Sequence, residues 1–190
     1  MPFGYYNGLN LKQKRIYRES DRVWAFPLPD PAAIQPLALK IQAALESGRL
    51  DRTQKWAQTL LNAITNQLGI RHIRLDLLDV RPSNPKMELH GLYYPTEGRK
   101  LPRMKLWMRT AKRKQVVAFK TFLRTLLHEL CHHLDYECLG LKDSFHTEGF
   151  YKRESSLVVQ ILPPSEPVPQ RNGVHRNGVP HLLPMKKRVG

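Results

Sequence analysis

The stretch "FLRTLLHELCHHLDYECLG", residues 122–140, decides how the rest of the chain is interpreted, because it contains three histidines within six positions. His128, Glu129 and His132 fit the pattern His-Glu-x-x-His. Residues four apart lie on one face of an α-helix, so both imidazoles can reach the same metal ion. Zinc is the natural metal for imidazole ligands with one open position. The alternative is a solvated histidine face with capping or salt-bridge roles.

The residues around this motif predict a long amphipathic helix over residues 116–137. Apolar side chains recur along it at intervals of three and four, which gives a strong apolar stripe beside the histidine face. Gly140 ends the helix, and His133 points away from the metal-binding face. The stripe consists of Phe119, Phe122, Leu123, Leu126, Leu130 and Leu134.

Outward from this helix, the sequence predicts an α+β fold. Three segments before the helix have strand character and are separated by short turns, which favours an antiparallel meander, with a mixed sheet as the alternative. Two helices precede these strands, and one more helix follows the histidine motif. The predicted strands are residues 73–77, 87–94 and 103–110, and the predicted helices are residues 31–47, 51–68 and 147–162.

These elements predict one domain over residues 31–162, with its core at 70–162. Residues 1–30 form a basic N-terminal segment without a firm secondary-structure assignment. The segment 163–190 contains six prolines and five Lys or Arg residues, and too little apolar content to fold alone. It is therefore predicted to be a disordered tail.

A metal ion in this motif needs a third protein ligand, and four downstream side chains are candidates. Cys138 lies about two turns beyond His132 on a continuous helix, too far to share the ion, so it is more simply a packing thiol. Asp135 lies near the metal face, where it could bind the ion or hydrogen-bond to a ligand. His146 follows a loop, so the chain can fold back and present it. Glu148 is the remaining candidate.

Two motifs carry a family resemblance, "LLHELCHHLD" and, after a loop, "SFHTEGFYKRESSL". Together they resemble the SprT-like zinc metallopeptidases, the group that includes Spartan. The segment "HTEGF" matches the family's "HGxxF"-type motif, with Thr147 at the glycine position. The resemblance covers residues 70–162 and implies a zincin-like minimal metalloprotease domain, with a small three-stranded sheet packed on the metal-binding helix. It also implies one zinc ion per chain bound by His128, His132 and His146, with Glu129 as general base.

The resemblance has two further implications. The chain lacks the paired cysteines of the zinc ribbon found in many relatives, so no second metal site is expected. In zincins generally, the strand before the metal helix lines the cleft and pairs with the substrate backbone. The segment 103–110 would then be this edge strand.

The expected activity is hydrolysis of peptide bonds in a protein or peptide substrate. A zinc-activated water attacks the carbonyl, and Glu129 accepts the water proton and passes it to the leaving amine. The negative intermediate needs a second electrophile. Tyr151, Arg153 and Tyr136 are candidates, with ordinary surface or packing use as the alternative.

The chain is strongly basic, with 31 Lys or Arg residues against 16 Asp or Glu residues and a net charge of +15. Ten of the basic residues lie between residues 99 and 124, where no acidic residue occurs. Positive charge interleaved with an aromatic ring is typical of a surface that contacts phosphates, so DNA is a candidate partner through this belt and the tail. The alternative is a solvated strand face that discourages pairing with other chains. The candidate contacts are Arg103, Lys105, Trp107, Arg109, Lys112, Arg113 and Lys114.

No apolar run resembles a signal peptide, and none approaches the roughly 18 residues of a membrane span. Cys131 and Cys138 are predicted to be free thiols, which suits a reducing compartment, so a cytoplasmic protein without membrane association is expected. The leading hypothesis is a SprT-like zinc endopeptidase that acts on nucleic-acid-associated proteins. One alternative is a zinc-stabilised nucleic-acid-binding module without catalytic turnover. Another is a metal-free basic interaction protein in which the motif is fortuitous.

Overall fold

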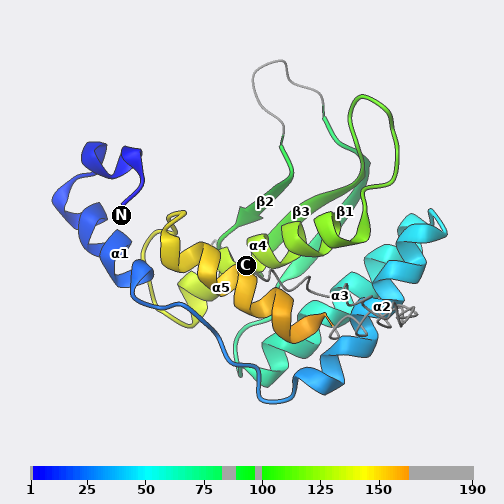
Figure 1. Cartoon of the computed structure of the whole chain (residues 1–190), viewed down its shortest axis with the longest axis horizontal. Coiled ribbons are helices and arrows are strands. Elements are labelled where there is room, and N and C mark those ends of the chain that lie inside the picture. The colour runs from blue at the N-terminus through cyan, green and yellow to red at the C-terminus, as the bar shows by residue number, and fades with distance from the viewer. Residues whose placement is uncertain (1, 83–88, 97–99, 163–190) are drawn as a thin grey trace, which may run out of the picture.

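The computed structural model describes residues 2–82, 89–96 and 100–162. The described residues form a mixed α+β fold with a small three-stranded sheet, as the sequence predicts (Figure 1). The expected tail, and the beginning of the expected second strand, lie outside the described residues. The elements are the 3₁₀ helix η1 (Gly4–Gly8), helices α1 (Leu11–Asp21), α2 (Pro31–Glu46), α3 (Leu50–Gln67), α4 (Phe119–Glu137) and α5 (Glu148–Ile161), and strands β1 (Arg74–Val80), β2 (Gly91–Tyr94) and β3 (Arg103–Arg109).

The sheet is mixed rather than an antiparallel meander, so the favoured prediction of strand pairing is wrong. The strand order is β1-β3-β2, with β3 parallel to β1 and antiparallel to β2. Alternation of apolar side chains determines which face of a strand is buried, but it does not determine the neighbour of that strand. The expectation that residues 103–110 form the edge strand is corrected at the same time. β3 is central, and β2 is an edge.

The opposite edge of the sheet, along β1, is closed by two glutamines of α3. The side chain of Gln54 donates to the carbonyl of Leu75 and accepts from the amide of Leu77. Gln58, one helical turn later, donates to the carbonyl of Ile73 and accepts from the amide of Leu75. These side chains satisfy backbone groups that an additional strand would otherwise pair with. Within the described part of the chain, the outer side of β2 is therefore the open sheet edge.

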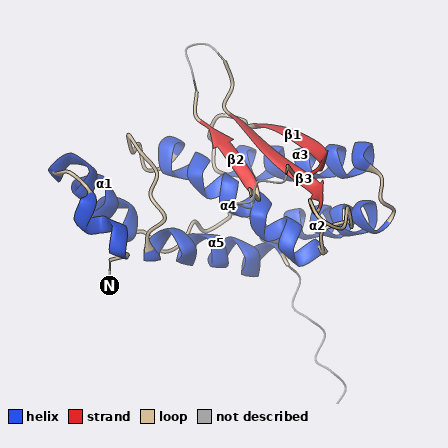
Figure 2. Cartoon of the chain, turned by 90° about the horizontal axis from the view of Figure 1, so that it is seen from above, coloured by secondary structure: helices blue, strands red, loops and turns tan. Residues whose placement is uncertain are grey.

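The metal-motif helix α4 lies between the sheet and α5 (Figure 2). Its apolar stripe is buried against the sheet and the neighbouring helices, as the spacing predicts, except for Phe119 at the start of the helix, which is half-buried. α5 begins where the side chain of Thr147 accepts a hydrogen bond from the Phe150 amide. A serine or threonine at this position fixes the start of a helix, and it also fixes where the preceding residue, His146, emerges.

The N-terminal residues form ordered structure that packs on α5. The guanidinium of Arg153 is completely buried and donates to the carbonyls of Ser20 and Val23 at the end of α1. The amide of Gly149 donates to the carboxylate of Asp21 at 2.8 Å. A Cβ at position 149 would lie 2.5 Å from the carbonyl oxygen of Asp21, so the two helices touch through the glycine. None of the helices within the described residues has the length and apolar character needed to cross a membrane.

Candidate metal centre

Three imidazoles from two parts of the chain converge at one point. His128 and His132 lie one turn apart on α4, and the loop before α5 brings His146 to them. The Nε2 atom of His146 lies 3.0 Å from that of His128 and 3.1 Å from that of His132. These are the three histidines that the family resemblance implies as ligands. Their ring nitrogens are close enough to one another to hold a single metal ion.

The other ring nitrogen of two of these histidines has a specific partner. The Nδ1 atom of His128 lies 2.9 Å from a carboxylate oxygen of Glu154. The Nδ1 atom of His132 lies 2.7 Å from the hydroxyl of Ser144, which donates its own proton to Asp135. Because a carboxylate only accepts and the Ser144 proton is already used, both Nδ1 atoms must donate. With the proton on Nδ1, the neutral form of each ring presents its Nε2 lone pair to the centre of the cluster.

This arrangement of nitrogen atoms fits a cation better than it fits hydrogen bonding. A single proton on Nε2 of His146 can be donated to His128 or to His132, but not to both. A cation between the rings would accept electron pairs from all of them. Burial lowers the pKa of His132 to about 3, with the neighbouring imidazoles adding to the effect, and burial likewise lowers the pKa of His146. Both rings are therefore neutral near pH 7, as metal ligands must be.

Glu129 lies on the wall of the same cleft, packed under β2. Its side chain is only 5% exposed, and burial raises its pKa to about 7, against an opposing effect of His128. A Cβ at Gly91 would lie 2.8 Å from both Cγ and Cδ of Glu129. The backbone of β2 therefore approaches the carboxylate more closely than any residue with a side chain would permit.

The cleft has a volume of about 720 Å³ and is open to the edge of β2. Its lining combines the histidine cluster and Glu129 with β2 residues and with the rings of Tyr136 and Tyr151. Tyr151 is 42% exposed and stacks on the ring of His146 with 5.9 Å between centroids. Tyr136 stacks instead on Tyr93, whose hydroxyl lies 3.2 Å from Nδ1 of the buried His133. Of these two candidate stabilisers, Tyr151 is the one beside the histidine cluster.

Arg153, the third candidate stabiliser, does not reach the cleft. It forms a completely buried ion pair with Asp135 at 2.7 Å, in addition to its bonds to the end of α1. Residue 153 lies on the side of α5 that faces α1, so its side chain points into the interior. The sequence does not reveal which side of α5 faces α1. This placement corrects the expectation that Arg153 could contact the transition state.

The three other candidate ligands lie apart from the histidine cluster. Asp135 is buried and accepts from Arg153 and Ser144, so it supports His132 through the serine hydroxyl rather than facing the ion. Cys138 is exposed at the end of α4, and the two cysteines are free thiols, as predicted. Glu148 forms an ion pair with Lys152 at 2.8 Å on the surface of α5.

Glu154, Ser144 and Tyr5 are site residues that sequence reasoning missed. Glu154 had a readable signal, since it occupies a core-facing position in the α5 stripe of Phe150, Leu157 and Ile161, where a carboxylate needs a partner. Ser144 and Tyr5 had none. The hydroxyl of Tyr5 donates to the carbonyl of His146 at 2.8 Å, a contact across 141 positions of sequence.

The basic belt, residues 99–124, does not form one continuous surface of exposed and unpaired cations. Trp107 is only 7% exposed, which corrects its place among the candidate nucleic-acid contacts. Arg109 is paired with Asp79 at 2.9 Å. The remaining candidate cations are exposed or half-buried. Two of them contact the aromatic ring of Tyr94: Cζ of Arg103 lies 4.6 Å and Nζ of Lys105 lies 5.6 Å from the ring centroid.

Comparisons with protein-family models, with curated proteins and with solved structures find no match to this chain. The function is therefore inferred from the residues and the geometry of the site.

Proposed function

We propose that this protein is a zinc-dependent endopeptidase with a zincin-like, SprT-like domain. The convergence of three histidine Nε2 atoms, beside a buried glutamate in an open cleft, carries this proposal. Three imidazoles that leave a position open toward solvent are a typical ligand set of catalytic zinc. When bound, the zinc ion supplies a Lewis acid that polarises a carbonyl and lowers the pKa of a water molecule.

Glu129 is suited to move the proton in this reaction. A general base works best when its pKa lies near the operating pH, and burial raises the pKa of Glu129 to about 7. Its carboxylate accepts a proton from the attacking water and delivers it to the nitrogen of the departing amine. The close approach of Gly91 leaves room for the carboxylate directly against β2, so the proton acceptor lies at one side of the cleft.

The open edge of β2 gives the substrate a place to bind. An extended peptide can pair with the free backbone groups of an edge strand, which supplies affinity without selecting particular side chains. The edge along β1 is closed by Gln54 and Gln58, and β3 is central. A peptide that pairs with β2 would pass beside Glu129 and the three histidines. Tyr151 is then the proposed donor to the developing negative charge.

The test is the variant Glu129→Gln, compared with the unmodified protein after zinc loading. Elemental analysis is expected to give about one zinc per chain in both proteins. Cleavage of a denatured protein substrate is expected only in the unmodified protein, and removal of zinc by a chelator should abolish it reversibly. Cleavage by the variant would contradict the mechanism. Zinc in both proteins without cleavage by either would favour the nucleic-acid-binding module.

A further inference from the structure

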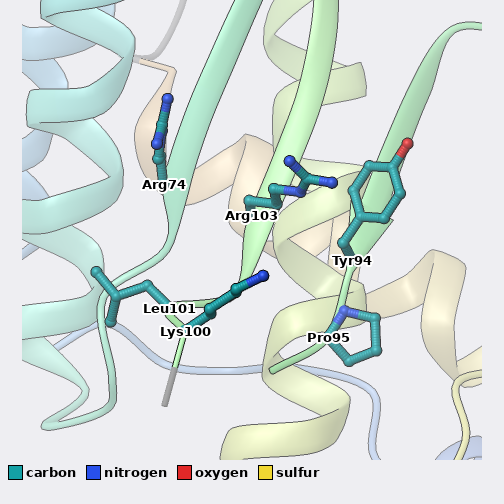
Figure 3. Close-up of a pocket in the computed structure, with 6 residues that line it drawn as sticks. All are labelled: Arg74, Tyr94, Pro95, Lys100, Leu101 and Arg103. Atoms are coloured by element: carbon teal, nitrogen blue, oxygen red, sulfur yellow. The ribbon is translucent and has the colours of Figure 1, made fainter. Parts of the chain in front are cut away.

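A second pocket, distinct from the metal centre, lies at the far end of β2, and its described lining is rich in cations. It has a volume of about 390 Å³ and lies between the ends of β2 and β3 (Figure 3). Of the described residues that line it, three are cations and none is acidic. These residues are Arg74, Tyr94, Pro95, Lys100, Leu101 and Arg103.

Two of the three cations are available to a ligand. Arg74 is paired with Asp76 at 2.9 Å. Lys100 and Arg103 are both exposed, and no carboxylate among the described residues pairs with either of them. The guanidinium of Arg103 lies over the Tyr94 ring, 4.6 Å from its centroid, which restricts its orientation. Figure 3 shows Lys100 and Arg103 pointing toward the same space beside Tyr94 and Pro95.

This pocket adjoins the catalytic cleft through a shared residue. Pro95 lines both of them. Gly91, in contact with Glu129, marks the catalytic position on β2, and Tyr94 lies three residues further along the strand. At about 3.3 Å per residue, these two positions are roughly 10 Å apart. Side chains of an extended peptide alternate between the two faces of a sheet, so every second side chain of a peptide on β2 would point to the face of Tyr94 and Arg103.

We propose that this pocket is a specificity subsite for an acidic side chain of the substrate, about three residues from the bond that is cleaved. The inference rests on the proposed peptidase function. An ammonium and a guanidinium that converge on one space recognise a carboxylate by charge-assisted hydrogen bonds. A nucleic-acid backbone fits less well, because Asp76 lies beside the pocket and pairs with Arg74, which interrupts the row of cations that a chain of phosphates would follow.

The experiment uses fluorescent 14-residue peptides that contain a single Glu, moved one position at a time, with Gln counterparts. Binding is measured by anisotropy on zinc-loaded Glu129→Gln protein, which is expected to bind without cleaving. Cleavage sites and kcat/KM are measured with the unmodified protein. We expect the Glu peptides to bind about fivefold more tightly than the Gln peptides, as for two partly exposed ion pairs. We expect cleavage about three residues from the Glu.

The preference should disappear in the double variant Lys100→Ala, Arg103→Ala, and persist in the matched control Lys112→Ala, Arg113→Ala, which removes two exposed cations outside the pocket. In Lys100→Glu, the preference should reverse toward a peptide with Lys at the same position. Gain of binding by a charge swap cannot result from misfolding.

The outcomes separate this inference from the proposed function. Cleavage without a preference for Glu overturns the subsite and leaves the peptidase. Selective binding of Glu peptides without any cleavage overturns the peptidase and leaves the anion pocket. Absence of both binding and cleavage overturns the subsite. Displacement of a single-stranded oligonucleotide that depends on Lys100 and Arg103, without selectivity among peptides, assigns the pocket to nucleic acid and also overturns it.

Discussion

The contact between β2 and the proposed general base predicts a large effect of adding one methyl group. In Gly91→Ala, the new Cβ would lie 2.8 Å from Cγ and Cδ of Glu129. Carbon atoms in contact prefer about 3.5 Å, and the new Cβ would lie closer still to Oε1, so the glutamate has to move by at least roughly 0.7 Å. A misplacement of about 1 Å can reduce a rate about 100-fold, so kcat/KM should fall between about 10-fold and 100-fold. A quenched fluorescent peptide that the unmodified protein cleaves reports this rate.

The same variant should leave zinc content and thermal stability nearly unchanged. The atoms that Cβ meets belong to the end of a flexible side chain, which can turn away at little cost, and the substitution touches none of the three histidines. Gly8→Ala is the matched control, because a Cβ there meets nothing within 4 Å. Unchanged activity in Gly91→Ala would refute the role of Glu129. A loss of zinc would refute the separation between the base and the metal ligands.

Three further predictions concern the groups that support the histidine cluster and the cations on the outer face of β3. In Glu154→Gln, loss of the charged acceptor behind His128 should weaken zinc affinity about 10- to 100-fold in competition with a chelator. In Asp135→Asn, the buried guanidinium of Arg153 loses its counter-charge, so the free energy of unfolding in urea should fall by about 3–5 kcal/mol. In Lys105→Ala, which removes a β3 cation that does not line the proposed subsite, the slope of log affinity against log salt for a single-stranded oligonucleotide should decrease by about 0.7, the value for one lost cation.

Each of these predictions has a control and a contrary result. Glu46→Gln removes an exposed carboxylate far from the metal centre in the sequence and should not change zinc affinity. An equal loss of stability when Asp51, an exposed carboxylate, is replaced by Asn would show that the Asp135 effect does not come from burial. An unchanged salt slope would show that the outer face of β3 is an ordinary solvated surface that does not contact nucleic acid.

Local spacing along the chain was enough to predict the helices α4 and α5 and the pairing of two of the three clustered histidines. The apolar repeat predicted a helix over 116–137, and α4 spans Phe119–Glu137. The last helix was predicted over 147–162, and α5 spans Glu148–Ile161, with Thr147 as its cap. Helix geometry relates residues four apart, so the pairing of His128 with His132 was available from sequence alone. His146 was one of four candidates for the third ligand, and the family resemblance rather than the spacing singled it out.

The tertiary structure alone decided which distant groups support these ligands and which surfaces stay open. Sequence alternation could not show that β3 is central, and that burial withdraws Trp107 from the surface. Nor could it show that the buried Arg153 donates hydrogen bonds to Asp135 and to the end of α1. Hydrogen bonds within a helix join neighbours in sequence, whereas strand order and buried ion pairs join residues that only packing brings together. The sequence therefore determined the spacing of the histidine motif, and the fold determined the cleft around it.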